Sequence, residues 1–511
     1  MNLSHLFQRS VQLYGDYPAL IKGKQLPTSY KQLGKRVRML AFWLRNELGL
    51  APGDRVTLAL KNCTEYLELL LASWHGGLCV VPVNIKLHPD EIAYMVSNSG
   101  SRACITQEAL FQPMQDALVG VPEVKVLSLD SSLFQRAFDC PELSLGSDND
   151  QSLAWLFYTS GTTGKPKGVM LSHANLVSMA MHFYSDVQSV SPNSILLHAA
   201  PMSHGSGLYS IPYFIKGGAQ LVPDSGGFEE AELFDLFAHY QDVSVFAALT
   251  MVRRMVGFAQ SYCPEVSGLR SIIVGGAPFY VEDIKQAVGC FGPRIIHMYG
   301  QGESPMTISA LPPGNLAHAV ETGDMNMLSS VGFPQTAMQV EILDHNDQPV
   351  PEGELGEVVV RGPTVMMGYW NNPEATAKTL LNGALKTGDI GMLDTRGMLY
   401  LKDRSKDVII SGGTNIYPRE VEDVLLAYPL VSEVSVVGAP DPEWGESIVA
   451  FVVTIPGKEV QVSELDAHCL THIARFKRPK RYVFVDNLPK NGAGKIMKRE
   501  LQQTLVNKNG Q

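Results

Sequence analysis

Short, uninterrupted apolar runs that alternate with longer helical patterns are the feature that most limits how this chain can fold. Examples are residues 55–60, 80–83, 195–197 and 271–274. Strands of this kind are apolar on both faces, which is typical of a parallel sheet covered by helices on each side. The sequence therefore predicts an α/β protein whose large N-terminal part has parallel sheets flanked by helices.

The pattern changes beyond residue 338. Residues 338–343 and 357–361 alternate apolar and polar side chains, which predicts an antiparallel, β-rich subdomain. The elements expected after this are a strand at 407–410, a helix from Pro418, a β-hairpin across 433–453, and a helix near Ser463 whose Ser463-x-x-Asp466 spacing resembles a capping box. We expect two domains, residues 1–403 and a small α+β unit at 404–511.

Charge and cysteine content exclude several classes of protein. With 41 basic and 51 acidic residues the net charge is −10, so the molecule repels polyanions, and nucleic acid is not an expected partner. No apolar run of about 18 residues predicts a membrane span, and the first residues lack a signal peptide. The seven scattered cysteines form no Cys-x-x-Cys pair, which argues against a zinc site or a disulfide framework. We expect a cytoplasmic protein.

Residues 158–168 are the segment most indicative of function. They read Tyr-Thr-Ser-Gly-Thr-Thr-Gly-Lys-Pro-Lys-Gly and lie between two apolar runs, so we expect a loop that joins two strands. Three glycines, four hydroxyls and two lysines suit a cradle for a polyphosphate, although the spacing is not that of a P-loop NTPase. A solvated flexible loop is the alternative. The phosphate-binding candidates are Thr159, Ser160, Gly161, Thr162, Thr163, Gly164, Lys165 and Lys167.

This segment resembles the signature loop of the adenylate-forming (AMP-binding) superfamily, which includes acyl-CoA synthetases, luciferases and the adenylation domains of peptide synthetases. Further stretches resemble other motifs of the superfamily in the same order, at residues 201–205, 275–278, 299–303, 386–389, 403–407, 412–422 and 489–495. The resemblance covers essentially the whole chain. It favours the acyl-CoA synthetase branch, whose members are fatty-acid- or aryl-CoA ligases.

The resemblance implies how the nucleotide is held. The implied contacts are an adenine-binding turn at Gly276, Ala277 and Pro278, stacking of Tyr299 on adenine with Gly300 and Gln301 beside it, and ribose binding by Asp389 and Arg404. The alternative for Tyr299 is aromatic core packing, and the alternative for Asp389 is an Asx-turn residue that binds its own backbone.

The chemistry implied by the resemblance is activation of a carboxylic acid. The carboxylate attacks the α-phosphorus of ATP and pyrophosphate leaves, so negative charge builds on the phosphoryl oxygens. The catalytic candidates are Glu303 as the Mg²⁺ ligand, Lys495 as the cation required for adenylation, and His204 in the motif near the acyl pocket. The alternatives are a helix-capping Glu303 and a Lys495 that belongs to the solvated basic cluster of residues 472–499.

Thioester formation then needs a route for the thiol of coenzyme A. By the resemblance, the C-terminal unit reorients about a hinge at Lys406, and Gly412 and Gly413 bring the backbone close to the pantetheine arm. Two departures from the superfamily pattern stand out. Gly302 replaces a threonine that usually contacts the α-phosphate and the metal, and residues 383–385 lack the aromatic residue that often precedes the ribose turn.

Together these features predict an ATP-dependent carboxylic acid:CoA ligase (AMP-forming) that uses ATP, Mg²⁺ and coenzyme A. The acyl pocket that the resemblance implies, around residues 204–208, 246–251, 275–276, 299–300 and Met306, is mostly apolar or small and suits a fatty or aromatic acid. Because Arg253 and Arg254 could bind a second carboxylate, a malonyl-type dicarboxylic acid is an alternative substrate. A luciferase-like oxygenase shares the first half-reaction, and a nucleotide-binding pseudoenzyme is the non-enzyme alternative. A homodimer is also left open.

Overall fold

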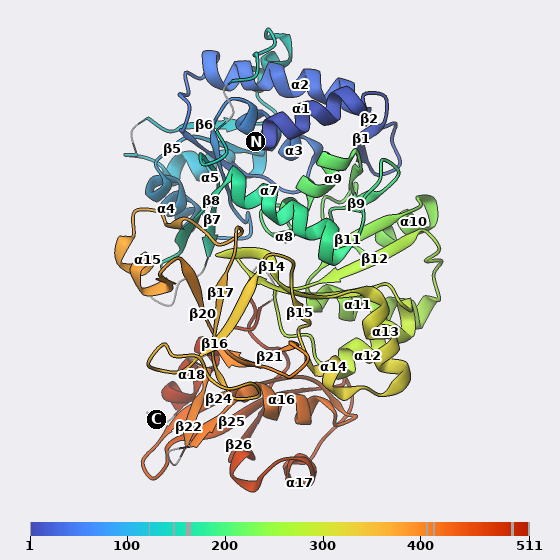
Figure 1. Cartoon of the computed structure of the whole chain (residues 1–511), viewed down its shortest axis with the longest axis vertical. Helices are drawn as coiled ribbons and strands as arrows, with labels where there is room; N and C mark the ends of the chain where they lie inside the picture. Colours follow the sequence, from blue (N-terminus) through green and yellow to red (C-terminus); the bar gives the residue numbers. More distant parts are fainter. Residues whose placement is uncertain are drawn as a thin grey trace.

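The computed structural model describes residues 2–121, 123–146, 149–159, 165–404, 407–411, 414–491 and 495–508. The molecule contains four sheets (Figure 1). Two large sheets and their helices form the N-terminal body, a smaller antiparallel sheet lies in the middle, and the C-terminal unit occupies the far end. The predicted α/β class, with a β-rich subdomain and a small α+β unit after it, is confirmed.

The nine-stranded sheet has the order β15-β14-β13-β12-β11-β9-β10-β1-β2, and its strands from β13 to β1 are parallel. Its strands are β1 Pro18–Lys22, β2 Thr28–Ser29, β9 Ile195–Leu197, β10 Ala219–Val222, β11 Val243–Ala247, β12 Leu269–Val274, β13 Ile295–Gln301, β14 Ser304–Leu311 and β15 Phe333–Pro334. The strands expected at 195–197 and 271–274 are therefore confirmed as β9 and β12.

The seven-stranded sheet has the order β18-β8-β7-β4-β3-β5-β6, with β7, β4, β3, β5 and β6 parallel. Its strands are β3 Arg55–Ala59, β4 Cys79–Pro82, β5 Ser101–Thr106, β6 Lys125–Ser128, β7 Leu153–Thr159, β8 Lys167–Ser172 and β18 Gly368–Tyr369. The strands expected at 55–60 and 80–83 are β3 and β4. The antiparallel β7–β8 pair confirms that two strands flank the glycine-rich segment.

Helices bury both faces of the two large sheets. In the N-terminal body they are α1 Leu3–Leu13, α2 Tyr30–Phe42, α3 Thr64–His75, α4 Pro89–Ser99, α5 Glu108–Ala117, α6 Ser132–Gln135, α7 His173–His182, α8 Gly205–Leu208, α9 Ser210–Lys216, α10 Glu230–His239, α11 Leu249–Tyr262, α12 Val281–Phe291, α13 Pro313–Thr322 and α14 Met325–Ser329. In β4, Val80 belongs to the core shared by the two sheets and Val81 to the core on the opposite face, with Ile92 and Met95 of α4. Burial on both faces explains why the strand is continuously apolar.

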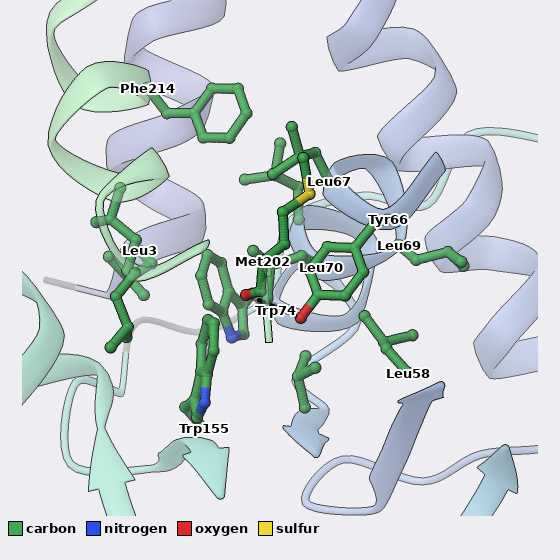
Figure 2. Packing of buried hydrophobic residues seen from close by; sticks show 14 of the residues in the cluster. Leu3, Leu58, Tyr66, Leu67, Leu69, Leu70, Trp74, Trp155, Met202 and Phe214 are labelled. Carbon is green, nitrogen blue, oxygen red and sulfur yellow. Dashed lines mark hydrogen bonds between the residues drawn. The ribbon is translucent and has the colours of Figure 1, made fainter. Parts of the chain in front are cut away.

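The shared core is rich in large side chains (Figure 2). Trp74 of α3 lies beside Trp155 of β7, with ring centroids 6.3 Å apart. The buried Tyr66 hydroxyl donates a hydrogen bond to the carbonyl of Met202, 3.2 Å away. This contact ties α3 to the segment that enters α8.

The middle and C-terminal sheets carry the remaining elements. The middle sheet contains β16 Gln339–Leu343, β17 Gly356–Arg361, β19 Leu380–Leu381, β20 Ala384–Leu393 and β21 Leu399–Arg404, with α15 Pro373–Thr379 beside it. The C-terminal unit contains β22 Ile409–Ser411, β23 Thr414–Ile416, α16 Pro418–Leu426, β24 Val431–Asp441, β25 Gly445–Thr454, α17 Val462–His472, β26 Arg481–Phe484 and α18 Lys498–Lys508. All pairings in the middle sheet are antiparallel, as predicted.

One local prediction was wrong. Helix α17 begins at Val462, and its capping box joins Gln461 with Glu464, whose carboxylate accepts a hydrogen bond from the Gln461 backbone N–H at 2.8 Å. Ser463 therefore lies inside the first turn, where its hydroxyl cannot act as the N-cap with Asp466.

No helix in the described part combines the length and the apolar character needed to cross a bilayer. All seven cysteines are free thiols.

Candidate functional site

The phosphate-loop candidates lie at the end of the β7–β8 pair. Thr159, the last residue of β7, pairs with Lys167, the first residue of β8. The Lys165 Nζ lies 5.3 Å from the ring centroid of Tyr94, and the Lys167 Nζ lies 5.1 Å from that of Tyr369. Five candidates lie outside the described residues: Ser160, Gly161, Thr162, Thr163 and Gly164.

Glu303 lies in the two-residue turn between β13 and β14, because Gln301 pairs with Ser304 across it. A strand follows, so the alternative that Glu303 caps a helix is wrong. The Tyr369 hydroxyl donates a hydrogen bond of 2.7 Å to the Glu303 carboxylate. Burial, and then the Glu303 carboxylate, raise the pKa of Tyr369, which keeps the phenol protonated. Tyr369 thus contacts Glu303 through its hydroxyl and Lys167 through its ring.

Sequence reasoning missed Tyr369. It lies 66 residues from Glu303 and reaches it through the β18–β8 pairing, in which Tyr369 lies opposite Val169. The Gly368-Tyr369 pair carries no spacing that points to a carboxylate so far away. Its one signal is a phenol on a short, buried strand, where a partner for the hydroxyl is required.

The donor set at Glu303 suits Mg²⁺. In the part of the chain that the structure describes, no group of three or more His, Cys, Asp and Glu side chains gathers into a metal cage. Mg²⁺ is commonly held by one or two carboxylates together with the phosphates of the substrate. The single carboxylate of Glu303, near Lys167 at the start of β8, fits that pattern. It does not fit the donor sets that zinc or calcium needs.

Three side chains from two distant parts of the chain meet at Asp389. Its carboxylate accepts hydrogen bonds from Gln301 Nε2 at 2.6 Å and from the Tyr299 hydroxyl, and it pairs with Arg404 Nε at 2.7 Å. The β20–β21 register places Asp389 directly opposite Arg404. Burial and the Asp389 carboxylate raise the pKa of Tyr299, which keeps it a donor. These partners are side chains of β13 and β21, so an Asx turn does not account for Asp389.

The predicted adenine turn follows directly on β12, at the carboxyl end of the parallel strands. Gly276 has a φ of +85°, a left-handed conformation that favours glycine. Gly276 and Pro278 are exposed and Ala277 is half-buried. Ligands of α/β sheets bind outside the carboxyl ends of the strands, and β13, which ends in Tyr299, Gly300 and Gln301, contributes to the same edge.

His204 and its neighbours form an apolar corner. His204 precedes α8, and its ring meets the Phe157 ring edge to face with centroids 5.5 Å apart. Its Nδ1 lies 2.9 Å from the Ser203 hydroxyl oxygen. Burial lowers the pKa of His204 to about 4, so the imidazole is neutral near pH 7.

The backbone of Gly205 lies against Met306 and Phe246. A Cβ on Gly205 would meet the Met306 Cε and would lie 2.8 Å from the Phe246 ring. Met306 holds a left-handed backbone conformation with φ of +64°. Such strain in a non-glycine residue costs of order 1 to 3 kcal/mol and gathers at ligand sites.

Gly302 is closely packed rather than vacant. A Cβ at this position would lie 2.7 Å from the Thr159 Cγ2 and 2.8 Å from the ring of Phe157. The phenyl ring therefore occupies the room that the usual threonine would need, which gives a physical reason for this departure.

Arg253 and Arg254 are both committed to carboxylates of the chain itself. Arg253 binds Asp283 through two hydrogen bonds of 2.7 and 2.9 Å. Arg254 binds Glu230 through two hydrogen bonds of 2.5 and 2.7 Å. Two-pronged pairs of this kind satisfy the guanidinium, so neither arginine favours a second carboxylate on the substrate.

Of the candidate residues that follow β21, only Lys495 lies among the residues that the structure describes. Lys495 is exposed, and its backbone N–H donates a hydrogen bond of 2.9 Å to the Asn491 side chain. The hinge candidate Lys406 and the pantetheine candidates Gly412 and Gly413 lie outside the described residues.

Comparison with known proteins gives a consistent result. The family described as AMP-binding enzyme matches residues 7–370, and the AMP-binding enzyme C-terminal domain matches residues 420–495. A feruloyl-CoA synthase from an Amycolatopsis species is 34% identical over 478 residues, 93% of each chain. A long-chain-fatty-acid–CoA ligase from Mycobacterium tuberculosis is 33% identical over 468 residues, 89% of each chain. The crystal structure of ATP-bound MatB from Rhodopseudomonas palustris matches with a TM-score of 0.87 and 28% identity over 99% of each chain.

Proposed function

The chain belongs to the family of AMP-binding enzymes, and from this premise we propose how its residues ligate a carboxylic acid to coenzyme A with formation of AMP. The enzyme is an AMP-forming acid–thiol ligase. In its first half-reaction a carboxylate oxygen attacks the α-phosphorus of ATP, and the bond to pyrophosphate breaks. In the second, the thiol of coenzyme A attacks the acyl carbonyl, the bond to AMP breaks, and a thioester forms.

The meeting of Tyr299, Gln301, Asp389 and Arg404 is the observation that carries the proposal. Asp389 has the acceptor oxygens for ribose hydroxyls, and Arg404 balances its charge. The exposed turn at Gly276, Ala277 and Pro278 and the ring of Tyr299 enclose the adenine between them. A preorganised polar pocket of this kind holds the nucleoside without rearrangement.

The phosphate end is assigned to the β7–β8 loop and its flanks. Thr159, Lys165 and Lys167 bind the phosphates together with residues 160–164. Glu303 holds the magnesium ion, and Tyr369 orients its carboxylate through the hydrogen bond of 2.7 Å. When bound, Mg²⁺ neutralises charge on the phosphates. Lys495 supplies the cation that stabilises charge at the α-phosphate, in the role that the family resemblance implies.

The substrate is a fatty or aromatic monocarboxylic acid. Phe246, Met306, Phe157 and a neutral His204 form apolar walls, which suit an uncharged acyl group. Arg253 and Arg254 are already paired, so the dicarboxylic alternative is not favoured. Glu303 and Lys495 are both present, so the pseudoenzyme alternative is not favoured either.

The C-terminal unit serves the second half-reaction. We keep residues 1–403 and 404–511 as the two domains, Lys406 as the hinge, and Gly412 and Gly413 as the passage for the pantetheine arm. Seven free thiols support a reducing, cytoplasmic location.

A substrate panel tests the proposal. Acid-dependent exchange of pyrophosphate into ATP and thioester formation are measured with hydroxycinnamic, benzoic, medium-chain, long-chain and malonic acids. We expect exchange and thioester formation with a fatty or aromatic acid and little with malonate. Binding of ATP without exchange for any acid would favour a pseudoenzyme, and preference for malonate would overturn the assigned substrate class.

A further inference from the structure

A buried lysine outside the candidate site connects the C-terminal unit to the N-terminal body. Lys498 is the first residue of α18, and its side chain is 19% exposed. Its Nζ lies 2.9 Å from Glu422 Oε1 of α16 and 3.8 Å from Asp403 Oδ2 of β21. Glu422 and Asp403 are 4% and 8% exposed, so one cation is shared between two buried carboxylates.

The same carboxylates contact segments on the other side. Glu422 Oε2 accepts a hydrogen bond of 3.0 Å from the hydroxyl of Tyr280, which precedes α12 and lies two residues after Pro278. Asp403 accepts hydrogen bonds from the backbone N–H groups of Arg404 at 2.8 Å and Arg419 at 3.0 Å. We call Lys498, Glu422, Asp403 and Tyr280 the Lys498 cluster. It joins the adenine turn, the ribose-binding strand and the start of α18.

The cluster is linked mechanically to Lys495. Residues 489–491 and 495–497 run antiparallel, and Lys490 pairs with Ile496. We call these two described segments the Lys495 hairpin. The backbone N–H of Met497 donates to the Pro489 carbonyl at 2.8 Å, and that of Asn491 donates to the Lys495 carbonyl at 2.8 Å. Lys498 follows at the base of this hairpin. Three residues span at most about 11 Å, so anchoring Lys498 limits where Lys495 can lie.

The buried carboxylates of Asp403 and Glu422 need the positive charge of Lys498 nearby. Burial raises the pKa of Asp403 to about 6, Lys498 opposes that shift, and Glu422 adds to it. Removing the cation would leave two carboxylates facing each other in a buried place, which is strongly unfavourable. The pair would then separate, and the contacts between α16, β21 and Tyr280 would loosen with it.

We propose that Lys498 is a positioning residue for adenylation, which holds the Lys495 hairpin against the nucleotide site through Asp403, Glu422 and Tyr280. The inference rests on the proposed function, in which Lys495 acts at the α-phosphate. Lys498 is not among the residues assigned to substrate binding above, and its contacts are with Asp403 and Glu422. Small misplacements of a catalytic group lower rates by about 100-fold, which sets the expected scale.

The test compares both half-reactions in four variants. Lys498→Met should lower acid-dependent pyrophosphate exchange about 100-fold, and thioester formation from supplied acyl-AMP less than tenfold. Lys498→Arg should recover most of the exchange because the charge returns, and Tyr280→Phe should lower it about fivefold. The control is Arg478→Met, which removes a cation of similar exposure (22%, against 19% for Lys498) that pairs with Asp466 inside the C-terminal unit. It should change both half-reactions less than threefold.

A readout without substrates separates this inference from the proposed function. Hydrogen exchange of residues 489–491 and 495–497 should become faster in Lys498→Met than in Arg478→Met, even if the wild-type enzyme activates none of the acids tested. Unchanged protection of the hairpin would overturn the anchoring. Equal loss of both half-reactions in Lys498→Met, with no recovery in Lys498→Arg, would also overturn it. A wild-type enzyme that lacks exchange would instead count against the proposed function.

Discussion

The nucleotide side of the candidate site and its acid side are held together by different forces. On the nucleotide side, Asp389 receives hydrogen bonds or ionic contacts from Tyr299, Gln301 and Arg404. On the acid side, the contacts are apolar, as where Gly205 packs against Met306 and Phe246.

This difference matters because polar networks and apolar walls fail in different ways. A buried polar group that loses its partner is costly whatever the substrate, whereas an apolar wall changes shape and affects substrates unequally. Substitutions on the nucleotide side should therefore impair every acid alike. Substitutions on the acid side should alter the preference among acids.

The largest effect is expected at Lys495, which we propose acts at the α-phosphate. Lys495→Ala should lower acyl-adenylate formation a few hundredfold, about 3 to 4 kcal/mol, because a cation beside the developing charge is lost. Thioester formation from supplied acyl-AMP should remain largely intact. Rapid-mixing measurements of the two half-reactions check this, and equal loss in both would remove Lys495 from its assigned role.

Asp389→Asn tests the nucleotide side. The change keeps the shape but removes the charge that balances Arg404, so kcat/KM for ATP should fall about 50-fold. The loss should be the same with every acid. Asp347→Asn, which removes a more exposed partner of Lys386 near the same sheet, is the control and should stay within about twofold. A loss that varies with the acid would contradict the comparison.

Gly302→Thr tests the boundary between the sides. The new side chain would collide with Phe157 and Thr159, so adenylation should fall about 20-fold, in keeping with overpacking of 1 to 3 kcal/mol. Adding Phe157→Leu should restore most of the rate because the ring that fills the space is gone. The assay is pyrophosphate exchange. An unchanged rate in Gly302→Thr would show that the site accommodates threonine after all.

Gly205→Ala tests the acid side. Its Cβ would press on the Phe246 ring and on the flexible end of Met306, so kcat/KM for bulky aromatic acids should fall about tenfold. The KM for ATP should not change. Gly257→Ala in α11, where a Cβ meets open space, is the matched control. Equal losses for small and bulky acids would count against a shape-dependent wall.

The smallest effect concerns pH. Because burial lowers the pKa of His204 to about 4, adenylation should show no inflection from this group between about pH 6 and 8. A histidine in the unfolded chain binds its proton near pH 6.5, so the unfolded state is protonated first. The free energy of unfolding should therefore fall as the pH drops from about 6.5 through about 4. Urea unfolding of wild type and His204→Asn checks this, since the variant should lose that part of the dependence.

Local sequence patterns predicted much of the framework. The run at 195–197 matches β9 in full, and the glycine-rich segment lies between two paired strands as expected. These features depend on neighbouring residues, whose apolar pattern and turn chemistry act within a few positions. The cap of α17 was missed because the capping-box pattern expects Ser or Thr at the N-cap, which Ser463 offers and Gln461 does not.

Contacts between distant segments could not be predicted in the same way. Nothing near Tyr369 indicates that its hydroxyl binds Glu303, and nothing near Gly302 indicates that Phe157 fills the space beside it. The commitment of Arg253 to Asp283 depends on how α11 packs against α12. Such contacts are set by register and helix packing.

The sequence by itself determined the α/β framework, the order of the motifs and the residue types of the candidate site, because these depend on local periodicity and on chemistry carried by single residues. Only the tertiary structure decided which of those residues touch. It placed Asp389 opposite Arg404 across the β20–β21 pair, and it left Gly302 no room for a side chain. It also brought Lys498 into contact with Asp403 and Glu422. The physical reason is that a buried charge or a close-packed ring is satisfied by whichever neighbour the fold brings within a few ångströms, however far apart the two lie along the chain.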